Sequence, residues 1–238
     1  MKRSLASAVL ALVVVLGLPA VGSAQEFRNM ELNAFVSANA HTKSNFEIGS
    51  PQSITPIQDQ FKLNDTLGGG LRFNVNTTGH WGEDIFFSYE PNKVHFVRKT
   101  PPTQDQSYAI RIYNVGANVM YYLNEAEGAR TRPFLSVGLG ATIDQPTGHA
   151  KQIANDPLQG NLPGFETASE LALNYGIGFK RHLTDTIGFR MDVRGFLSRN
   201  PTFGLPRNSA DPNAVVFPAF GAIHSLEVSA GIIFKFKR

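Results

Sequence analysis

Four consecutive residues near the end of the chain, His224-Ser225-Leu226-Glu227, carry a base, a hydroxyl and a carboxylate. A serine hydrolase uses these three groups together, because the histidine takes the serine proton and the carboxylate orients the histidine. The surrounding residues alternate between apolar and polar types, which predicts a β-strand with side chains on alternating faces. His224 should therefore point away from Ser225 and Glu227, and we expect a structural role for this segment.

Other groups that could hold a metal or a cofactor are dispersed. The chain has no cysteine, which excludes thiolate catalysis, cysteine-ligated metals and disulfide bonds. The remaining histidines lie in predicted loops and turns, with no two at the spacing of metal ligands. They are His41, His80, His95, His149 and His182. We expect no metal ion and no cofactor.

Residues 1–24 have the three parts of a secretory signal peptide. Lys2 and Arg3 come first, an apolar run follows over 5–18, and Gly22-Ser23-Ala24 supplies the small-residue cleavage site. That run is shorter than the roughly 20 residues that a spanning helix needs. We predict cleavage after Ala24 and one domain over residues 25–238. Removing Lys2 and Arg3 lowers the formal net charge from +3 to +1, and no basic cluster remains, so nucleic-acid binding is not expected.

Eight later segments alternate between apolar and polar residues, and their connectors are alternately long and short. No apolar run after the leader reaches the length of a spanning helix, so a membrane location requires a closed barrel. The pattern predicts an all-β fold, an eight-stranded antiparallel up-and-down transmembrane β-barrel whose first strand pairs with its last. The predicted strands cover residues 31–39, 67–76, 81–90, 108–123, 134–142, 170–181, 187–197 and 224–236.

The two faces of each predicted strand differ in chemistry. One face is apolar and free of charge, whereas the other collects charges and glycines. A lipid-facing Lys or Arg at mid-bilayer costs about 2 to 4 kcal/mol, so the apolar faces should meet lipid and the charged faces should fill the narrow interior. Buried charges need partners, and we expect the arginines of this set to pair with its Asp84, Asp192 and Glu227 in a polar plug. The predicted interior charge network is Arg72, Asp84, Glu170, Arg190, Asp192, Arg194 and Glu227.

A few positions depart from this pattern. Arg111 falls on the lipid face if the register of 115–119 is extended. Either it lies near the outer rim, where a charge costs little, or a bulge between Ile112 and Asn114 turns it inward. Phe35 and Phe86 point inward among polar neighbours, and we interpret them as core filling.

Gly79-His80-Trp81 is similar to the Gly-x-Trp motif of lipocalins, which are soluble eight-stranded barrels that hold an apolar ligand. A lipocalin would turn its apolar face inward. The glycines of this chain, such as Gly116 and Gly138, lie on the charged face, where a tight interior is crowded. We therefore interpret Trp81, Tyr121 and Phe236 as an aromatic girdle at one membrane interface.

The C-terminal segment, residues 229–236, is similar to the signal that the outer-membrane assembly machinery reads, with Gly231, Phe234 and Phe236 as its characteristic residues. Segments 133–140 and 188–194 match more loosely. On these residues the chain resembles the small outer-membrane β-barrel family, of the OmpA-like and opacity-protein type. In that family the terminal aromatic usually ends the chain, whereas Lys237 and Arg238 follow Phe236 here.

The resemblance implies a Gram-negative outer membrane, periplasmic termini beside the aromatic girdle, and contact with outer-membrane lipid, lipopolysaccharide and the assembly machinery. It implies no single activity. We predict a monomer that is not an enzyme and has a structural or surface-interaction role through long extracellular loops. The alternatives are a narrow pore, a lipid A-modifying barrel enzyme and a soluble lipocalin-like carrier.

The connector over 199–223 contains an apolar stretch where solvent is expected. It either packs on neighbouring loops or offers a docking surface to an unknown extracellular partner. Its residues are Val215, Val216, Phe217 and Phe220.

Overall fold

The computed structural model describes residues 27–42, 44–47, 58–77, 79–98, 106–125, 129–156, 164–208, 210, 216 and 221–237. The predicted leader lies outside these residues, as do Val215, Phe217 and Phe220 of the apolar loop stretch.

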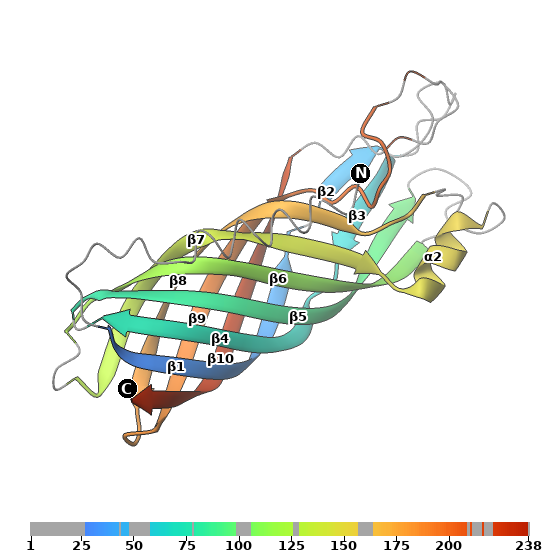
Figure 1. Cartoon of the computed structure of the whole chain (residues 1–238). Helices are drawn as coiled ribbons and strands as arrows, with labels where there is room; N and C mark the ends of the chain where they lie inside the picture. Colours follow the sequence, from blue (N-terminus) through green and yellow to red (C-terminus); the bar gives the residue numbers. More distant parts are fainter. Residues whose placement is uncertain are drawn as a thin grey trace.

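Eight long strands form a closed antiparallel barrel (Figure 1). Neighbours along the chain pair with one another, and β1 pairs with β10 over thirteen residues from Asn29↔Lys237 to His41↔Ser225, which closes the wall. This is the predicted fold. The strands are β1 Phe27–His41, β4 Thr66–Thr77, β5 Trp81–Arg98, β6 Gln106–Tyr122, β7 Thr131–Pro146, β8 Ala168–His182, β9 Ile187–Arg199 and β10 Ala222–Lys237.

The barrel wall is longer at one end than the sequence predicted. The predicted strand over residues 81–90 ends before Pro91. Strand β5 continues to Arg98, since Val94 and Phe96 still alternate inward and the pairing with β6 is unbroken. On its other edge, the pairing with β4 ends at Tyr89.

Two short strands in the first long loop extend this edge. Strands β2 (Ser44–Glu47) and β3 (Gln58–Leu63) form a hairpin, and β3 pairs with β5 from Val94 onward. The Asn92 side chain bridges the gap between β4 and β3, because it bonds both the backbone N–H and the carbonyl of Asn64 at 3.0 and 2.9 Å.

The third long loop contains a helix that the sequence analysis missed. Helix α2 spans Gly148–Asn155, and the Thr147 hydroxyl accepts a hydrogen bond from the Ala150 N–H, which caps its first turn. Ala150 and Ala154 face the barrel and are buried. None of the helices among the described residues has the length and apolar character needed to span a bilayer.

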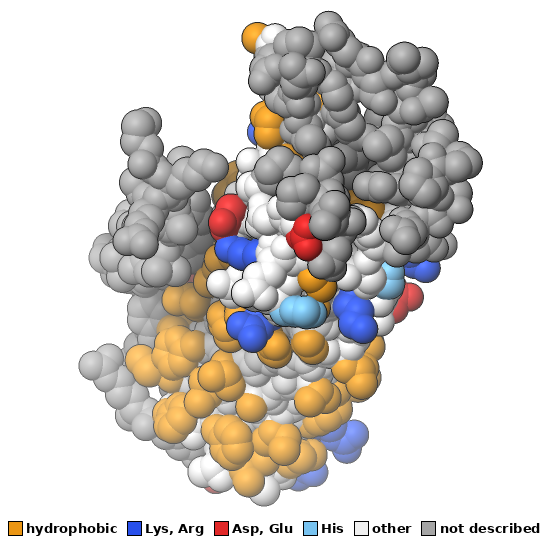
Figure 2. Space-filling view, turned by 90° about the vertical axis from the view of Figure 1, so that its right-hand side faces the viewer, with side chains coloured by type: hydrophobic (Ala, Val, Ile, Leu, Met, Phe, Trp, Pro, Cys, Tyr) orange, Lys and Arg blue, Asp and Glu red, His pale blue; other side chains and the backbone are white. Residues whose placement is uncertain are grey.

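The outward surface of the barrel is apolar. Val36 and Leu67 are 70% and 75% exposed, and Figure 2 shows apolar side chains gathered over one part of the wall with basic side chains at both edges. A lipocalin has the opposite facing, so the structure excludes that alternative.

The interior has two layers. Charged and polar side chains occupy the part near the short connectors, whereas an apolar cluster occupies the end near the long loops and α2. The sequence analysis expected a polar interior throughout and missed this change, because the cluster includes residues from segments expected to be loops. Its members are Leu63, Val94, Phe96, Tyr108, Ile110, Ile112, Ala150, Ala154, Phe165, Phe203, Leu205 and Ile223.

Candidate functional site

The centre of the barrel holds a network of three arginines and three carboxylates, all buried. Arg72 on β4 bonds Asp192 on β9 at 2.7 Å and Glu227 on β10 at 2.6 Å. Because β4 and β9 are separated by two strands in the wall, the first of these bonds crosses the lumen.

Arg190 is the most connected member of this network. Its guanidinium bonds Asp84 and Asp192 at 2.9 Å each, and it donates a further hydrogen bond to Asn74 at 2.8 Å. Arg194 bonds the same Asp84 oxygen at 3.2 Å. The structure thus brings together Arg72, Asp84, Arg190, Asp192, Arg194 and Glu227, and their formal charges cancel.

Aromatic rings cover the arginines of the network. The guanidinium of Arg72 lies 3.7 Å from the centre of the Phe35 ring, and that of Arg194 lies 4.7 Å from the Phe86 ring. Such contacts stabilise a cation in a desolvated site. The two inward phenylalanines therefore do more than fill space, because each one stacks on a buried charge.

Glycines make room for this network on the inner face. A Cβ atom on Gly178 would lie 2.4 Å from the Met191 carbonyl oxygen, 2.5 Å from an Asp192 carboxylate oxygen and 2.7 Å from the Phe134 ring. Any larger residue there would displace the ion pair or the ring.

The network is not completely satisfied by protein atoms. Nε and Nη1 of Arg194 and both polar side-chain atoms of Asn174 are buried and have no protein partner. These groups retain the capacity to bond water inside the barrel.

Glu170 does not join the network, contrary to the prediction. It lies near the long-loop end, where its nearest cation is Arg207 at 3.7 Å and both side chains are partly exposed. The prediction failed because Glu170 is close to the beginning of β8, beyond the reach of the central arginines.

A second buried pair lies nearer the short connectors. Lys180 bonds Glu31 at 2.7 Å and donates to the Tyr122 hydroxyl at 2.6 Å, while that hydroxyl donates to Asn76. Sequence reasoning missed Glu31 because its partner is 149 positions away.

A third polar cluster lies between the charged and apolar layers. His41 Nδ1 is 2.7 Å from the Ser225 hydroxyl, and His41 Nε2 is 2.7 Å from a Glu90 carboxylate oxygen. Thr66 and Asn92 donate to the same Glu90 oxygen at 2.9 and 2.6 Å. A hydroxyl, an imidazole and a carboxylate are thus hydrogen-bonded in the order found in a hydrolytic triad. The three residues that supply them are far apart in the sequence.

His224 is not part of this cluster, as strand alternation predicted. It points outward and its ring stacks on Tyr175, whose hydroxyl is 2.6 Å from His224 Nε2. Gly195 lies beneath the pair, because a Cβ atom there would be 2.7 Å from the tyrosine ring.

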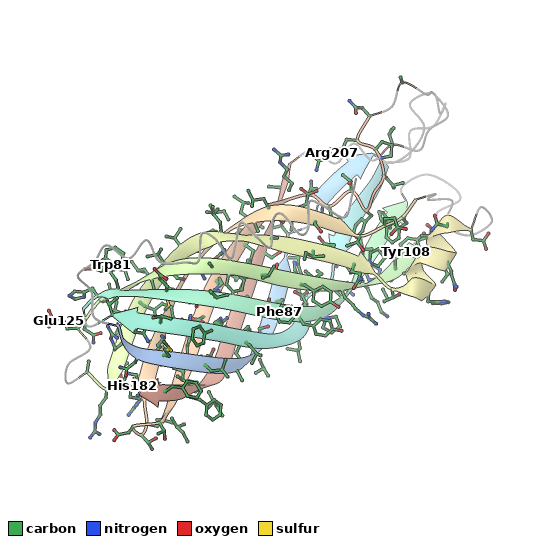
Figure 3. All side chains as sticks on the ribbon, in the orientation of Figure 1. Trp81, Phe87, Tyr108, Glu125, His182 and Arg207 are labelled. Atoms are coloured by element: carbon green, nitrogen blue, oxygen red, sulfur yellow. The ribbon has the colours of Figure 1, made fainter. Side chains whose placement is uncertain are left out.

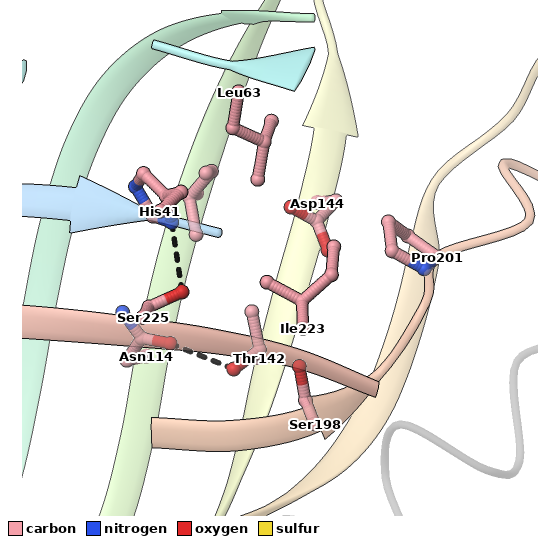
Figure 4. Close-up of a pocket in the computed structure, with 10 residues that line it drawn as sticks. His41, Leu63, Asn114, Thr142, Asp144, Ser198, Pro201, Ile223 and Ser225 are labelled. Atoms are coloured by element: carbon pink, nitrogen blue, oxygen red, sulfur yellow. Dashed lines mark hydrogen bonds between the residues drawn. The ribbon is translucent and has the colours of Figure 1, made fainter. Parts of the chain in front are cut away.

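The space beside Ser225 is small. A cavity of about 10 Å³ is lined by His41, Ser225, Ser198 and Asp144, among others (Figure 4). That volume is about the size of one water molecule. Asp144 faces the cavity from the outer part of β7, where it pairs with Ile112 and lies level with the exposed Arg111. Burial raises the pKa of the Asp144 carboxyl to about 7.

Aromatic side chains close the barrel above this cavity. Phe165 stacks on Phe203 with ring centres 4.8 Å apart and contacts Tyr108 at 5.2 Å. Phe203 and Gly204 adopt positive φ angles of 51° and 84°, which turn the chain so that the Phe203 ring enters the barrel. Val216, the described residue of the predicted apolar loop patch, is buried.

The predicted girdle residues are all exposed on the outer surface. Trp81 and Tyr121 pair across β5 and β6 with ring centres 5.1 Å apart, and Phe236 lies near the end of β10. Figure 3 shows Trp81 at the end opposite Tyr108 and Arg207. Of the predicted assembly-signal residues, Phe234 and Phe236 point outward, whereas Gly231 packs against β1, where a Cβ atom would lie 2.4 Å from the Ala34 carbonyl oxygen.

Arg111 lies on the outer surface near the long-loop end. Its pairing with Pro91 and Gln145 continues the register of both neighbouring strands without a bulge, so the rim position accounts for its exposure. Within the described ranges, no group of three or more histidine or acidic side chains is placed to hold a metal ion.

Comparison with known proteins identifies one family. The model described as outer membrane protein beta-barrel domain matches residues 8–217. No curated protein matches the chain.

Solved structures share the fold at low identity. The outer membrane protein OprG from Pseudomonas aeruginosa is 14% identical over 90% of this chain and 98% of its own, with a TM-score of 0.54. Neisserial surface protein A is 12% identical over 87% of this chain and 97% of its own, with a TM-score of 0.49.

Proposed function

Because the chain belongs to the outer-membrane β-barrel family, we propose that it is a plugged barrel without enzymatic activity, which acts in the envelope through its long loops. The family places it in the outer membrane of a Gram-negative bacterium. The proposal adds that the barrel conducts no ions, that both termini are periplasmic, and that the long loops contact an extracellular partner or support envelope integrity.

The filled interior is the observation that supports this proposal. A charge-balanced network occupies the middle of the lumen, and the apolar cluster occupies the outer end. An ion that crossed the barrel would have to separate buried ion pairs and then pass through an apolar region, and both steps are costly. Outer-membrane barrels carry short turns on the periplasmic side, which supports the proposed orientation.

Conductance in planar bilayers tests the proposal. The purified protein, refolded and checked for heat-modifiable gel mobility, should give no sustained conductance under conditions in which a porin control does. Sustained conductance that scales with protein concentration would overturn the plugged interior and favour a narrow pore.

One specific observation favours a second candidate, an acyl hydrolase. Ser225, His41 and Glu90 are connected by two short hydrogen bonds. The cavity beside Ser225 has room for one water molecule and none for an acyl chain, which disfavours this candidate. A fluorophosphonate probe should fail to label Ser225, with Ser225→Ala as the control. Labelling that the substitution abolishes, together with shortened lipid A in mass spectra of expressing cells, would establish the hydrolase instead.

A further inference from the structure

Three cationic side chains lie together on the outer surface of β3, β5 and β6, just beyond the apolar belt. They are Lys62, Lys93 and Arg111, and all three are exposed. We propose that this cationic patch binds the phosphate groups of a phosphorylated outer-leaflet lipid, that is, the lipid A phosphates. The inference rests on the proposed orientation, which places the long loops outside the cell.

Strand register brings the three cations together. Arg111 pairs with Pro91, and Lys93 is two residues further along the same face of β5. Lys62 pairs with His95, which is again two residues beyond Lys93. Diagonal neighbours of this kind have Cα atoms about 7 to 8 Å apart, within reach of long side chains. The three positive charges therefore follow one diagonal line across three strands.

No ion pair among the described residues neutralises this patch, in contrast to other cations at the same end. Lys151 is paired with Glu166, and Arg207 lies 3.7 Å from Glu170. The side-chain cations of Lys62, Lys93 and Arg111 make no ion pair or hydrogen bond with any described residue, although the Lys93 backbone N–H donates to Asn92. An anion from outside the chain would neutralise these three cations.

The surface directly below the patch supplies the apolar part of such a site. Tyr113 occupies the next outward position below Arg111 on β6, and Tyr89, its partner on β5, lies one outward position below Pro91. The two tyrosine ring centres are 5.5 Å apart, and Phe87 lies below them, 6.0 Å from Tyr113. Along this line the wall changes from apolar to aromatic to cationic. A lipid changes in the same order from acyl chain to glycerol or sugar to phosphate.

The position of the patch selects a lipid as the occupant. The cations continue a surface that faces acyl chains, so a phosphate that is tethered to acyl chains gains both contacts at once. Each Lys or Arg near the membrane surface raises the affinity for anionic headgroups about fivefold, and salt weakens this attraction.

Binding of bisphosphorylated lipid A to the folded protein in non-ionic detergent tests the inference, with native mass spectrometry counting bound lipid. Dephosphorylated lipid A is the comparison ligand, and K62Q, K93Q and R111Q are the variants. Wild type should bind the bisphosphorylated form more tightly, and each substitution should weaken that binding about fivefold without changing binding of the dephosphorylated form.

Two matched controls remove exposed cations elsewhere. Arg199→Gln acts at the same end of the barrel on β9, and Arg181→Gln acts at the opposite end on β8. Both should bind lipid A as wild type does. Equal binding of the two lipid A forms, or equal losses in patch and control variants, would overturn the inference. The inference would also be overturned if a soluble sulfated polysaccharide saturated the patch and lipid A did not bind there. Each of these results would leave the conductance test of the plugged barrel unaffected.

Discussion

Replacing Arg190 with glutamine tests the charge network most sharply. The substitution removes one cation from a balanced set and breaks the 2.9 Å bonds to both Asp84 and Asp192. Removing one partner of a buried ion pair costs about 3 to 5 kcal/mol, because a desolvated charge is left uncompensated. Asp84 keeps Arg194 at 3.2 Å and Asp192 keeps Arg72 at 2.7 Å, so we expect the lower part of that range, about 3 kcal/mol of unfolding free energy.

The assay is equilibrium unfolding by guanidinium in phosphatidylcholine vesicles. Trp81 is the only tryptophan, and it lies on the outer surface of the barrel, so its emission reports transfer between lipid and water. Arg207→Gln is the matched control, because its contact with Glu170 is longer and both groups are partly exposed. An exposed pair contributes about 0 to 1 kcal/mol.

A second substitution separates charge balance from packing. Arg190→Gln combined with Asp192→Asn restores equal numbers of positive and negative charges in the network, and it leaves Arg72 paired with Glu227 and Arg194 paired with Asp84. The double variant should recover at least about 1 kcal/mol relative to Arg190→Gln alone. If Arg190→Gln costs no more than Arg207→Gln, or if the second substitution makes the barrel still less stable, the reasoning is refuted.

Three further predictions use the same unfolding measurement. Gly178→Ala should lower the unfolding free energy by about 1 to 3 kcal/mol, because its Cβ would lie within 2.7 Å of three neighbours, whereas Gly79→Ala, which has open space, should have little effect; equal effects would contradict the packing account. Burial raises the pKa of Asp144 from 3.8 to about 7, so its folded form binds more protons than its unfolded form and its contribution to stability falls as pH rises between those values. Asp144→Asn should therefore stabilise the barrel more at pH 8 than at pH 5, and a pH-independent difference would count against this. His41→Ala should cost about 1 to 3 kcal/mol by leaving buried Glu90 without its imidazole partner, and Glu90→Gln should restore part of that loss; no recovery would argue that the contact is incidental.

The sequence predicted those features that depend on strand alternation. A period of two separates lipid-facing residues such as Val228 from interior residues such as Glu227, and a charge on the wrong face is costly, so facing follows from pattern. The same alternation correctly separated His224 from Ser225.

Contacts across the lumen could not be predicted in this way. Arg72 meets Asp192 only because β4 and β9 face each other across the closed barrel, and His41 meets Ser225 and Glu90 because three strands converge. The apolar outer layer was missed for a related reason. Phe96 and Phe203 belong to segments rich in proline or polar residues, where burial depends on what the rest of the barrel presents.

Spin-label accessibility along β10 tests the central claim most directly. The chain has no cysteine, so single cysteines can be introduced at each position from 226 to 236 and labelled in the vesicle-embedded protein. Outward positions such as Val228 and Ile232 should be accessible to oxygen, whereas inward positions such as Glu227 and Ser229 should be protected from both oxygen and a water-soluble nickel chelate. Access of the nickel chelate to the inward positions, or loss of the two-residue period, would contradict a barrel that faces lipid outside and is filled by its own charges within.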